Sequence, residues 1–470
     1  KEFFNISKYG VINLHAGPLP QYRGGSPLNW QIINGEKIIG VSITRMNEFI
    51  DLGDVLISKG FKLNDNENIY DAHNKANKIL TAFIDTLQTL PSFVYLIPVV
   101  MLFRVGDFTA MIAVVLYALA PAIRYTALGI KNINEELIEY RGAKASIMEI
   151  SHRGEDFMEV ARKSEKDLRD LLSIPNNYKV LFLQGGASAQ FSMVPINILR
   201  GKNIANYANT GLWSEKAITE ASRYCDVNIC TDSSNNNFTD IEDFEKWNIN
   251  EDAAYLHYVS NETIAGLEFD YIPEVKIPLV ADMSSTILSR EIDVSKFGVI
   301  YAGAQKNIGP SGLTIVIVRE DLLGQVVNAQ PKLFDYSTQA NNESMFNTPT
   351  TFSWYAAGCV FEWLNEQGGL NSMQKINQEK AKTLYAAIDN SDFYSNKVSN
   401  KYRSLMNVPF FLEDEELNAL FLEKSKEADL LALKGHRSVG GMRASIYNAM
   451  PKEGVNALVA FMKDFEKKFA

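Results

Sequence analysis

Hydrophobic and polar positions alternate differently in three stretches of the chain. In the first stretch, residues 1–90, short apolar runs are separated by polar loops that are rich in Gly and Pro. We expect strands at 11–15 and 40–44 and a helix over 68–90. This mixture predicts a mixed α/β piece.

The second stretch, residues 91–138, is much more apolar. Residues 93–103 and 108–120 form two hydrophobic runs, and a short segment with two charged side chains separates them. Each run is shorter than the roughly 20 residues that a bilayer-spanning helix needs. The pattern predicts an apolar helical hairpin, either buried in a soluble core or cut from a membrane protein.

The third stretch, from residue 139 onward, has a pattern of hydrophobic and polar positions that is typical of an α/β enzyme. Buried-strand patterns alternate with helical patterns, which favours a parallel sheet covered by helices. We expect strands at 178–183, 299–301 and 313–318.

Composition and charge narrow the class of protein. With 470 residues, of which 46% are hydrophobic and 22% charged, the chain is long enough to bury a substantial core. The net charge of −10 resides wholly in residues 139–470, because the first 138 residues carry equal numbers of acidic and basic side chains. An acidic body argues against nucleic acid as a partner. Three cysteines cannot build a disulfide framework or a four-cysteine zinc site, and no signal peptide opens the chain, so we expect free thiols, no metal and a cytoplasmic location.

A lysine and an aspartate at predicted strand ends carry the first chemical signal. Lys306 follows residues 300–305 in a small, Gly-rich loop, and Asp282 ends the run 279–281. Pyridoxal phosphate (PLP) chemistry needs such a pair, because the lysine forms a Schiff base and shuttles a proton while the carboxylate keeps the pyridine nitrogen protonated. The pair alone is a weak signal, since lysines and aspartates are common at strand ends on a surface.

The motifs around this pair occur in a specific order. They are SIMEISHR at 146–153, FLQGGAS at 182–188, SNET at 260–263, ADMSS at 281–285, IYAGAQKNIGP at 300–310 and KGHRSVGGMRASIYNAM at 434–450. Over about 330 residues this order closely resembles the phosphoserine aminotransferases, which are PLP enzymes of fold type I. The resemblance implies the same architecture for residues 140–470. That architecture is a large PLP-binding domain at 139–370, built on a mixed, mostly parallel sheet, and a small C-terminal α/β domain at 371–470.

The resemblance also implies roles for individual residues. Lys306 and Asp282 would be catalytic and would hold the cofactor. Further implied cofactor contacts are Ala187, Ser188, Trp213, Thr263, Gln305, Asn347 and Thr348, of which the last two would reach the cofactor of a partner subunit in a homodimer. The implied substrate-binding residues are His152, Arg153, His436, Arg437 and Arg443, which suit the carboxylate and phosphate groups of an acidic substrate.

The implied reaction is amino transfer between L-phosphoserine and 2-oxoglutarate, which gives 3-phosphohydroxypyruvate and glutamate. It belongs to serine biosynthesis and, in some organisms, to pyridoxine biosynthesis. The family opens with an Asn-Phe-x-Ala-Gly-Pro segment that lines the substrate site, and residues 132–141 show no counterpart of it. We therefore expect PLP binding to be retained and substrate binding to be impaired.

Asn13, His15 and Asp51 carry a second chemical signal. An Asn and a His two residues apart on a strand point to the same side, and with a carboxylate they can polarise a formyl carbonyl and shuttle a proton. The runs 13–30 and 46–54 resemble folate-dependent formyltransferases, which implies a partial, Rossmann-like α/β fragment over residues 1–90. This resemblance covers about 80 residues and lacks the family's preceding strands, so we expect the fragment to be inactive.

The apolar stretch resembles a third family, the permease subunit of a glycine-betaine ABC importer. The match is too short to form a transport pathway, and membrane association is disfavoured but stays open for residues 93–120. Since three unrelated families abut, we interpret the sequence as a composite chain whose near-complete unit is the aminotransferase. The alternatives are a formyltransferase, a non-functional composite, and a membrane-tethered or aggregating fusion.

Overall fold

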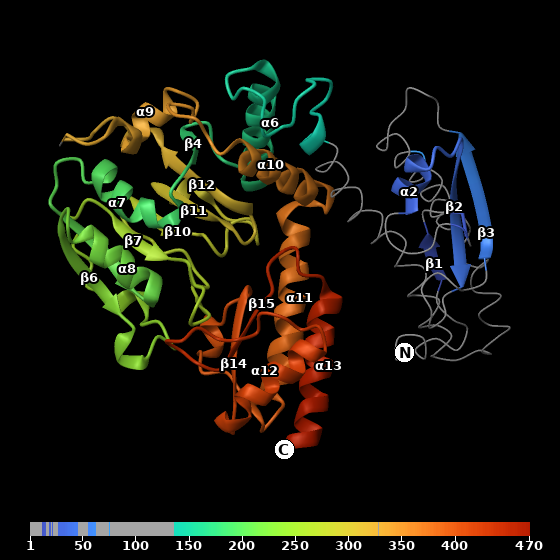
Figure 1. Ribbon diagram of the computed structural model, residues 1–470. Coiled ribbons are helices and arrows are strands. Elements are labelled where there is room, and N and C mark those ends of the chain that lie inside the picture. Colours follow the sequence, from blue (N-terminus) through green and yellow to red (C-terminus); the bar gives the residue numbers. More distant parts are fainter. Residues whose placement is uncertain are drawn as a thin grey trace. The chain divides into compact units, whose positions relative to one another are not determined.

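The computed structural model describes residues 12–15, 18–19, 21, 27–45, 55–62, 75, 136–327 and 329–470 (Figure 1). The chain forms two compact units, residues 1–132 and 133–470. Of the predicted helix at 68–90, only residue 75 is described, and it is helical. The predicted hairpin at 93–120 lies outside the described residues. No helix within the described ranges combines the length and apolar character needed to cross a membrane.

The described part of the first unit is a three-stranded antiparallel sheet with one helix. The elements are β1 (Ile12–His15), α2 (Pro27–Ile33), β2 (Ile38–Arg45) and β3 (Val55–Lys62). β2 pairs antiparallel with both β1 and β3. The segment 46–54 between β2 and β3 is too short for the crossover helix that a parallel pair needs. The pairing is therefore antiparallel, not parallel as in a Rossmann-like sheet.

A seven-stranded mixed sheet forms the centre of the second unit. Its strand order is β4-β12-β11-β10-β7-β5-β6. The four neighbouring pairs from β11 to β6 are parallel, whereas β12 runs antiparallel to both β4 and β11. The strands are β4 (Tyr178–Leu183), β5 (Ile204–Asn209), β6 (Asp226–Asp232), β7 (Leu256–Val259), β10 (Leu279–Asp282), β11 (Val299–Gln305) and β12 (Gly309–Arg319). The predicted strands and the mixed, mostly parallel sheet are confirmed.

Helices cover both faces of this sheet because side chains alternate along its strands. In β12, Ile315 and Ile317 join one buried cluster with residues of α6 and α10, while Val316 and Val318 join another with residues of α7, α8 and α9. Figure 1 shows these helices around the sheet. Their bounds are α6 (Glu155–Leu172), α7 (Gly186–Ile198), α8 (Leu212–Ala221), α9 (Tyr336–Ala340) and α10 (Thr351–Glu366).

Aromatic rings tie α6 and α10 to the sheet. Trp354 of α10 is 2% exposed and stacks on Phe182 of β4 with a centroid distance of 4.3 Å. Phe157 of α6 meets the same Trp354 ring edge-on at 5.8 Å. Offset and edge-to-face pairs of buried aromatic rings contribute roughly 0.5–1.5 kcal/mol beyond the area they bury. The three rings therefore fix this helical layer on the sheet that carries the site.

The C-terminal elements pack around a third buried cluster. Figure 1 shows them below the main sheet, with α11 running from α10 toward them. They are α11 (Gly369–Asp389), β13 (Tyr394–Ser395), β14 (Asn407–Leu412), α12 (Asn418–Glu427), β15 (Met442–Ser445) and α13 (Lys452–Phe469). The three strands form an antiparallel sheet in the order β13-β14-β15, and the short strands β8 (Asn261–Glu262) and β9 (Leu267–Glu268) pair separately.

The topology brings distant chain segments to one edge of the main sheet. β5, β7, β10 and β11 are parallel, and β4 shares their direction because both β4 and β11 run antiparallel to β12. The carboxyl ends of all five strands therefore lie at the same edge, where ligands of open α/β sheets usually bind. The segments that leave this edge begin at Gln184, Thr210, Ser260, Met283 and Lys306.

Candidate active site

Lys306 lies in the tight turn between β11 and β12. Its φ of +54° falls in the left-handed region, which residues other than Gly adopt only where the surrounding structure holds them. Its Nζ donates a hydrogen bond to Thr263 Oγ1 at 2.8 Å. Burial lowers the pKa of the Lys306 ammonium, the Asp282 carboxylate opposes this shift, and Arg443 reinforces it. The lowered pKa favours the neutral amine, which is the nucleophilic form.

Asp282 ends β10 and is 4% exposed. Its Oδ1 accepts hydrogen bonds from the Ser284 backbone N–H at 2.8 Å and the Ser284 hydroxyl at 2.6 Å. Burial raises the pKa of this carboxyl, and the Ser284 hydrogen bonds and the Lys306 charge oppose the rise. A buried carboxylate is stabilised by a nearby cation, and the protonated ring nitrogen of PLP is a cation of suitable chemistry.

A glycine turn starts α7 at the same edge. Gly185 and Gly186 have φ values of +92° and +64°, and Ala187 and Ser188 follow in the first helical turn. A Cβ on Gly303 of β11 would lie 2.9 Å from the Ala187 backbone nitrogen, so a glycine there keeps this amide accessible. Because the first N–H groups of a helix lack helical partners, this turn is suited to bind a phosphate.

Glu262 is a site residue that was not predicted. It is fully buried, and its carboxylate accepts hydrogen bonds from the backbone N–H groups of Trp213 at 3.0 Å and Ser214 at 2.9 Å, at the start of α8. A Cβ on Gly211 would lie 2.5 Å from the Glu262 carboxyl carbon, so only glycine allows this approach. Burial raises the pKa of Glu262 to about 7, although the two backbone hydrogen bonds oppose the rise. The available signal was an acid three residues after the end of a buried strand, at the same edge as Asp282.

Thr263 links Lys306 to Arg443. Arg443 lies in β15, and its Nη1 donates to the Thr263 carbonyl oxygen at 3.4 Å. Its buried Nε has no hydrogen-bond partner within the part of the chain that the structure describes. A half-buried guanidinium with a free donor beside an amine is suited to hold a substrate carboxylate. The structure thus brings together the predicted Lys306, Thr263 and Arg443.

Trp213 begins α8 beside this group. Its indole Nε1 is buried and has no hydrogen-bond partner among the described residues, and Lys216 Nζ lies 4.6 Å from the ring centroid. The Glu262 carboxylate accepts a hydrogen bond from its backbone N–H, which holds the start of α8 at the carboxyl edge of the sheet. An aromatic face at this edge is suited to pack against a planar cofactor ring.

Four other predicted anion-binding residues lie on loops. In the described ranges, no hydrogen bond or ion pair joins any of them to Lys306. His436 Nδ1 lies 2.7 Å from Ser438 Oγ, and the buried His152 Nε2 has no hydrogen-bond partner in the described chain. The two neighbouring arginines, Arg153 and Arg437, are exposed. Their roles in phosphate binding stay predictions.

The remaining predicted cofactor contacts lie near the glycine turn or the end of β11. The Thr348 carbonyl oxygen accepts hydrogen bonds from Gln184 Nε2 at 2.7 Å and from Asn347 Nδ2 at 3.4 Å. Asn347 lines a cavity of about 270 Å³ together with Gln184 and Gly185 of the same chain. Gln305 is exposed at the end of β11. Contact of Asn347 and Thr348 with a partner subunit's cofactor stays a prediction.

The predicted formyltransferase residues lie in the first unit. Asn13 and His15 both belong to β1, where they pair with Thr44 and Ser42 of β2. Asp51 lies outside the described residues. The predicted grouping of the three side chains therefore stays a prediction.

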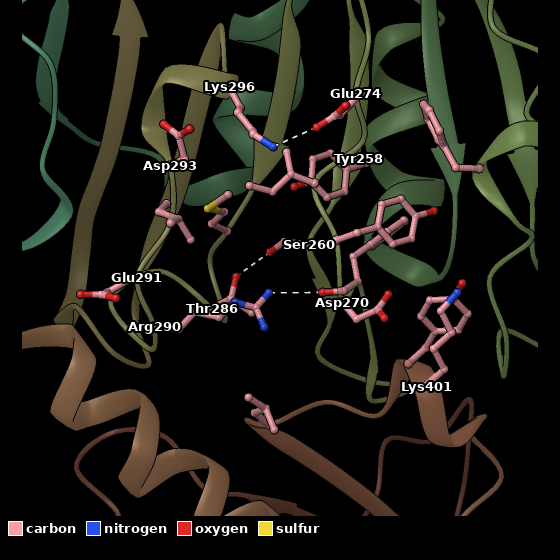
Figure 2. Close-up of a pocket in the computed structure, with 18 of the residues that line it drawn as sticks. Tyr258, Ser260, Asp270, Glu274, Thr286, Arg290, Glu291, Asp293, Lys296 and Lys401 are labelled. Atoms are coloured by element: carbon pink, nitrogen blue, oxygen red, sulfur yellow. Dashed lines mark hydrogen bonds and ion pairs between the residues drawn. The ribbon is translucent and has the colours of Figure 1, made fainter.

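A second cavity, of about 1070 Å³, is separate from the Lys306 group (Figure 2). Ser260 lines it and donates a hydrogen bond from its hydroxyl to the Asp282 carbonyl oxygen at 3.0 Å, so the cavity lies behind the Asp282 segment. Figure 2 shows the Lys296–Glu274 ion pair, 3.0 Å long, at its wall. No predicted PLP-binding residue is among the residues that line it.

Comparison with known proteins identifies the class. The aminotransferase class-V family matches residues 114–458, so the chain belongs to this family. The chain is therefore a PLP-dependent transaminase. A phosphoserine aminotransferase of Ruthia magnifica subsp. Calyptogena magnifica is 69% identical over 352 residues, which make up 75% of this chain and 98% of the relative. The chain therefore belongs with the phosphoserine aminotransferases.

Solved structures agree with this assignment. The chain is similar to phosphoserine aminotransferase from Bacillus circulans subsp. alkalophilus, with 44% identity, a TM-score of 0.71, and coverage of 73% of this chain and 95% of that one. The PLP-bound phosphoserine aminotransferase from Trichomonas vaginalis is 42% identical to this chain, with a TM-score of 0.69. The match covers 71% of this chain and 96% of the Trichomonas chain. The predicted fold-type I architecture and the PLP cofactor are confirmed, and Lys306, Asp282 and the glycine turn fit that cofactor.

Two further families match the N-terminal part. The formyl transferase family matches residues 1–83, and the binding-protein-dependent transport system inner membrane component matches residues 70–145. The second match overlaps the start of the class-V match. The three predicted resemblances are confirmed at the level of family, and the two N-terminal ones cover only short parts of the chain.

The variant Glu262→Gln should flatten the pH dependence of stability. Because the folded-state pKa of Glu262, about 7, exceeds the ordinary value of 4.5, the folded state binds the proton more tightly than the unfolded chain. The contribution of protonated Glu262 to the free energy of unfolding is fully present below pH 4.5, and it is lost as pH rises through about 7. In the wild type, this loss of stability is roughly 3 kcal/mol. The variant should not show it, because the Gln side chain does not titrate.

Urea unfolding from pH 4.5 to 8 measures this slope. Glu215→Gln, which changes an exposed acid of α8, the helix whose first N–H groups donate to Glu262, is the matched control and should keep the wild-type slope. An unchanged slope in Glu262→Gln would contradict the assigned pKa.

Proposed function

We propose that this chain transfers the amino group of L-phosphoserine to 2-oxoglutarate, giving 3-phosphohydroxypyruvate and glutamate. The observation that carries the proposal is the arrangement around Thr263. Its hydroxyl accepts a hydrogen bond from the Lys306 amine, and its carbonyl oxygen accepts one from the Arg443 guanidinium. The Lys306 amine, which would hold the cofactor, and the Arg443 cation, which would bind the substrate's α-carboxylate, are thus close together. The name of the similar enzymes supports phosphoserine as the amino donor.

The chain's own residues would hold the cofactor and move the protons. PLP, when bound, supplies a ring that accepts the electrons released at the α-carbon of the amino acid. Lys306 would hold the cofactor's aldehyde carbon and carry a proton with its Nζ, because burial favours its neutral form. Asp282 would keep a proton on the ring nitrogen. The first turn of α7, with Ala187 and Ser188, would bind the cofactor's phosphate.

Substrate recognition would divide between two cationic groups. Arg443 would bind the α-carboxylate with its free guanidinium donors. The pairs His436-Arg437 and His152-Arg153 would bind the substrate's phosphate, for which Arg provides planar, charge-assisted hydrogen bonds. In this division, Arg443, Arg437 and Arg153 would supply the positive charges that an acidic substrate needs from an acidic chain.

The half-reaction tests the proposal directly. Adding L-phosphoserine to the PLP-loaded chain should shift the visible absorbance of the cofactor, and adding 2-oxoglutarate should restore it. Lys306→Ala should leave no cofactor attached after borohydride reduction. Arg443→Ala should raise the KM for phosphoserine roughly 10- to 100-fold, because a charge-assisted contact contributes about 1.5–3 kcal/mol.

Arg223→Ala is the control for the loss of one positive charge, because Arg223 is exposed on the surface. It should leave the KM unchanged. Failure of phosphoserine to shift the absorbance of a loaded chain would overturn the substrate assignment, and unchanged trapping in Lys306→Ala would remove that lysine from its role.

The active form would be a homodimer. Asn347 and Thr348 would then contact the cofactor of the partner subunit, which requires two chains to complete two sites. Sedimentation of the PLP-loaded chain should give about twice the mass of 52.7 kDa. Asn347→Ala should weaken PLP binding without changing that mass, whereas a monomer with full activity would contradict the proposal.

In the cell, the reaction would supply serine biosynthesis in the cytoplasm and would also serve pyridoxine biosynthesis. Expression of the chain in a bacterium that lacks phosphoserine aminotransferase should remove its requirement for serine and for pyridoxine. The Lys306→Ala chain is the matched control. Rescue of the serine requirement alone would limit the role to serine biosynthesis.

A further inference from the structure

Lys380 is a buried lysine that the proposed reaction does not use. It lies in α11 with 0% exposure. Its Nζ donates hydrogen bonds to the carbonyl oxygens of Ile446 at 3.0 Å, Tyr447 at 2.8 Å and Met450 at 3.0 Å. An ammonium group has three N–H donors, so these three contacts satisfy all of them. All three carbonyls belong to one segment, residues 446–450, which we call the 446–450 turn.

Keeping a cation at this position costs free energy. Burial lowers the pKa of Lys380 to about 8, because the charged form is separated from water. Among the described residues, no carboxylate forms an ion pair with it, so backbone dipoles alone stabilise the charge. A buried hydrocarbon side chain would avoid this cost, which indicates that the three hydrogen bonds serve to hold the 446–450 turn.

The 446–450 turn is also joined to the Lys306 loop. The Asn448 backbone N–H donates to Asn307 Oδ1 at 3.0 Å, and Asn307 directly follows Lys306. Asn377 of α11 donates to Asn448 Oδ1 at 2.8 Å, and Asn448 Nδ2 donates to the Leu288 carbonyl oxygen at 2.7 Å. These asparagines are at least 94% buried, so the hydrogen bonds are shielded from water.

The other end of the turn leads to Arg443. Ile446 directly follows β15, the strand that carries Arg443. The 446–450 turn therefore connects the strand of the carboxylate-binding arginine to the loop of the reactive lysine. A displacement of this turn would change the separation of Lys306 and Arg443, although neither residue touches Lys380.

We propose that Lys380 is a positioning residue, which clamps the 446–450 turn and so holds Arg443 at the correct separation from Lys306. The inference rests on the proposed function, because it takes Arg443 as the residue that binds the substrate carboxylate. Lys380 contacts neither substrate nor cofactor in this role. It acts through the carbonyl groups of the turn.

Lys380→Met tests the clamp, because Met fills a similar volume and donates no hydrogen bonds. In the PLP-loaded enzyme, the KM for phosphoserine should rise about tenfold, since small misplacements of a binding group are costly, while kcat and PLP affinity change less than about twofold. Lys380→Arg, which keeps the charge and the donors, should recover part of the loss. Lys382→Met changes an exposed lysine of the same helix and should behave as wild type.

A double-mutant cycle separates positioning from general destabilisation. If Lys380 acts through Arg443, Lys380→Met should raise KM much less in the Arg443→Ala background than in the wild type. Equal effects in both backgrounds would overturn the proposal. If Lys380→Met gives no folded protein, Asn448→Ala, which weakens the same turn, should raise KM about threefold, and an unchanged KM would overturn the proposal.

Hydrogen exchange gives a readout that does not depend on turnover. In Lys380→Met, amide exchange should accelerate in residues 442–450 and 305–309, while α6 and α7 keep the wild-type rates. Unchanged exchange in both segments would show that Lys380 holds nothing there. A wild-type chain that does not transaminate phosphoserine would refute the proposed function, and the exchange data would still decide the role of Lys380.

Discussion

The common direction of five strands is the constraint on which the site depends. Because β4, β5, β7, β10 and β11 all end at one edge of the sheet, the loops that follow them meet there. Residues as distant in sequence as Ala187 and Lys306 thereby become neighbours: Gly303 of β11 approaches the Ala187 amide, and Lys306 begins the next turn. The aromatic and aliphatic layers on both faces hold the strands in this register.

Burial of charged groups is the main energetic cost of this arrangement. Asp282, Glu262 and Lys380 are each at most 4% exposed, and Lys306 is largely shielded from water. Burial disfavours the charged form of each group, and fixed dipoles compensate. Ser284 donates to Asp282, two backbone N–H groups of α8 donate to Glu262, and three carbonyls accept from Lys380. Side chains held in this way keep their positions before any ligand binds, which is what catalysis requires.

The N-terminal stretches contribute no comparable site within the described residues. The described part of the first unit has three antiparallel strands and one short helix, and the formyl transferase match ends at residue 83. Asn13 and His15 share one strand, as their spacing predicts, but a strand pair alone gives no pocket for a folate. The class-V match, by contrast, spans the whole seven-stranded sheet and the strand that carries Arg443. This difference between the N-terminal stretches and the aminotransferase part agrees with the interpretation of the sequence as a composite chain.

The sequence by itself determined strands such as 178–183 and 313–318 through their alternation, and the family through its ordered motifs, because both are local signals. The family in turn implied the mixed, mostly parallel sheet. The tertiary structure decided which residues meet. Glu262 escaped prediction because its role depends on the start of α8, where Ser214 lies 48 residues before Glu262 in the sequence. Lys380 escaped because a lysine in a helix normally faces water, and only the packing of α11 on the 446–450 turn buries it. Contacts between distant segments arise from sheet topology and packing, which local sequence patterns do not encode.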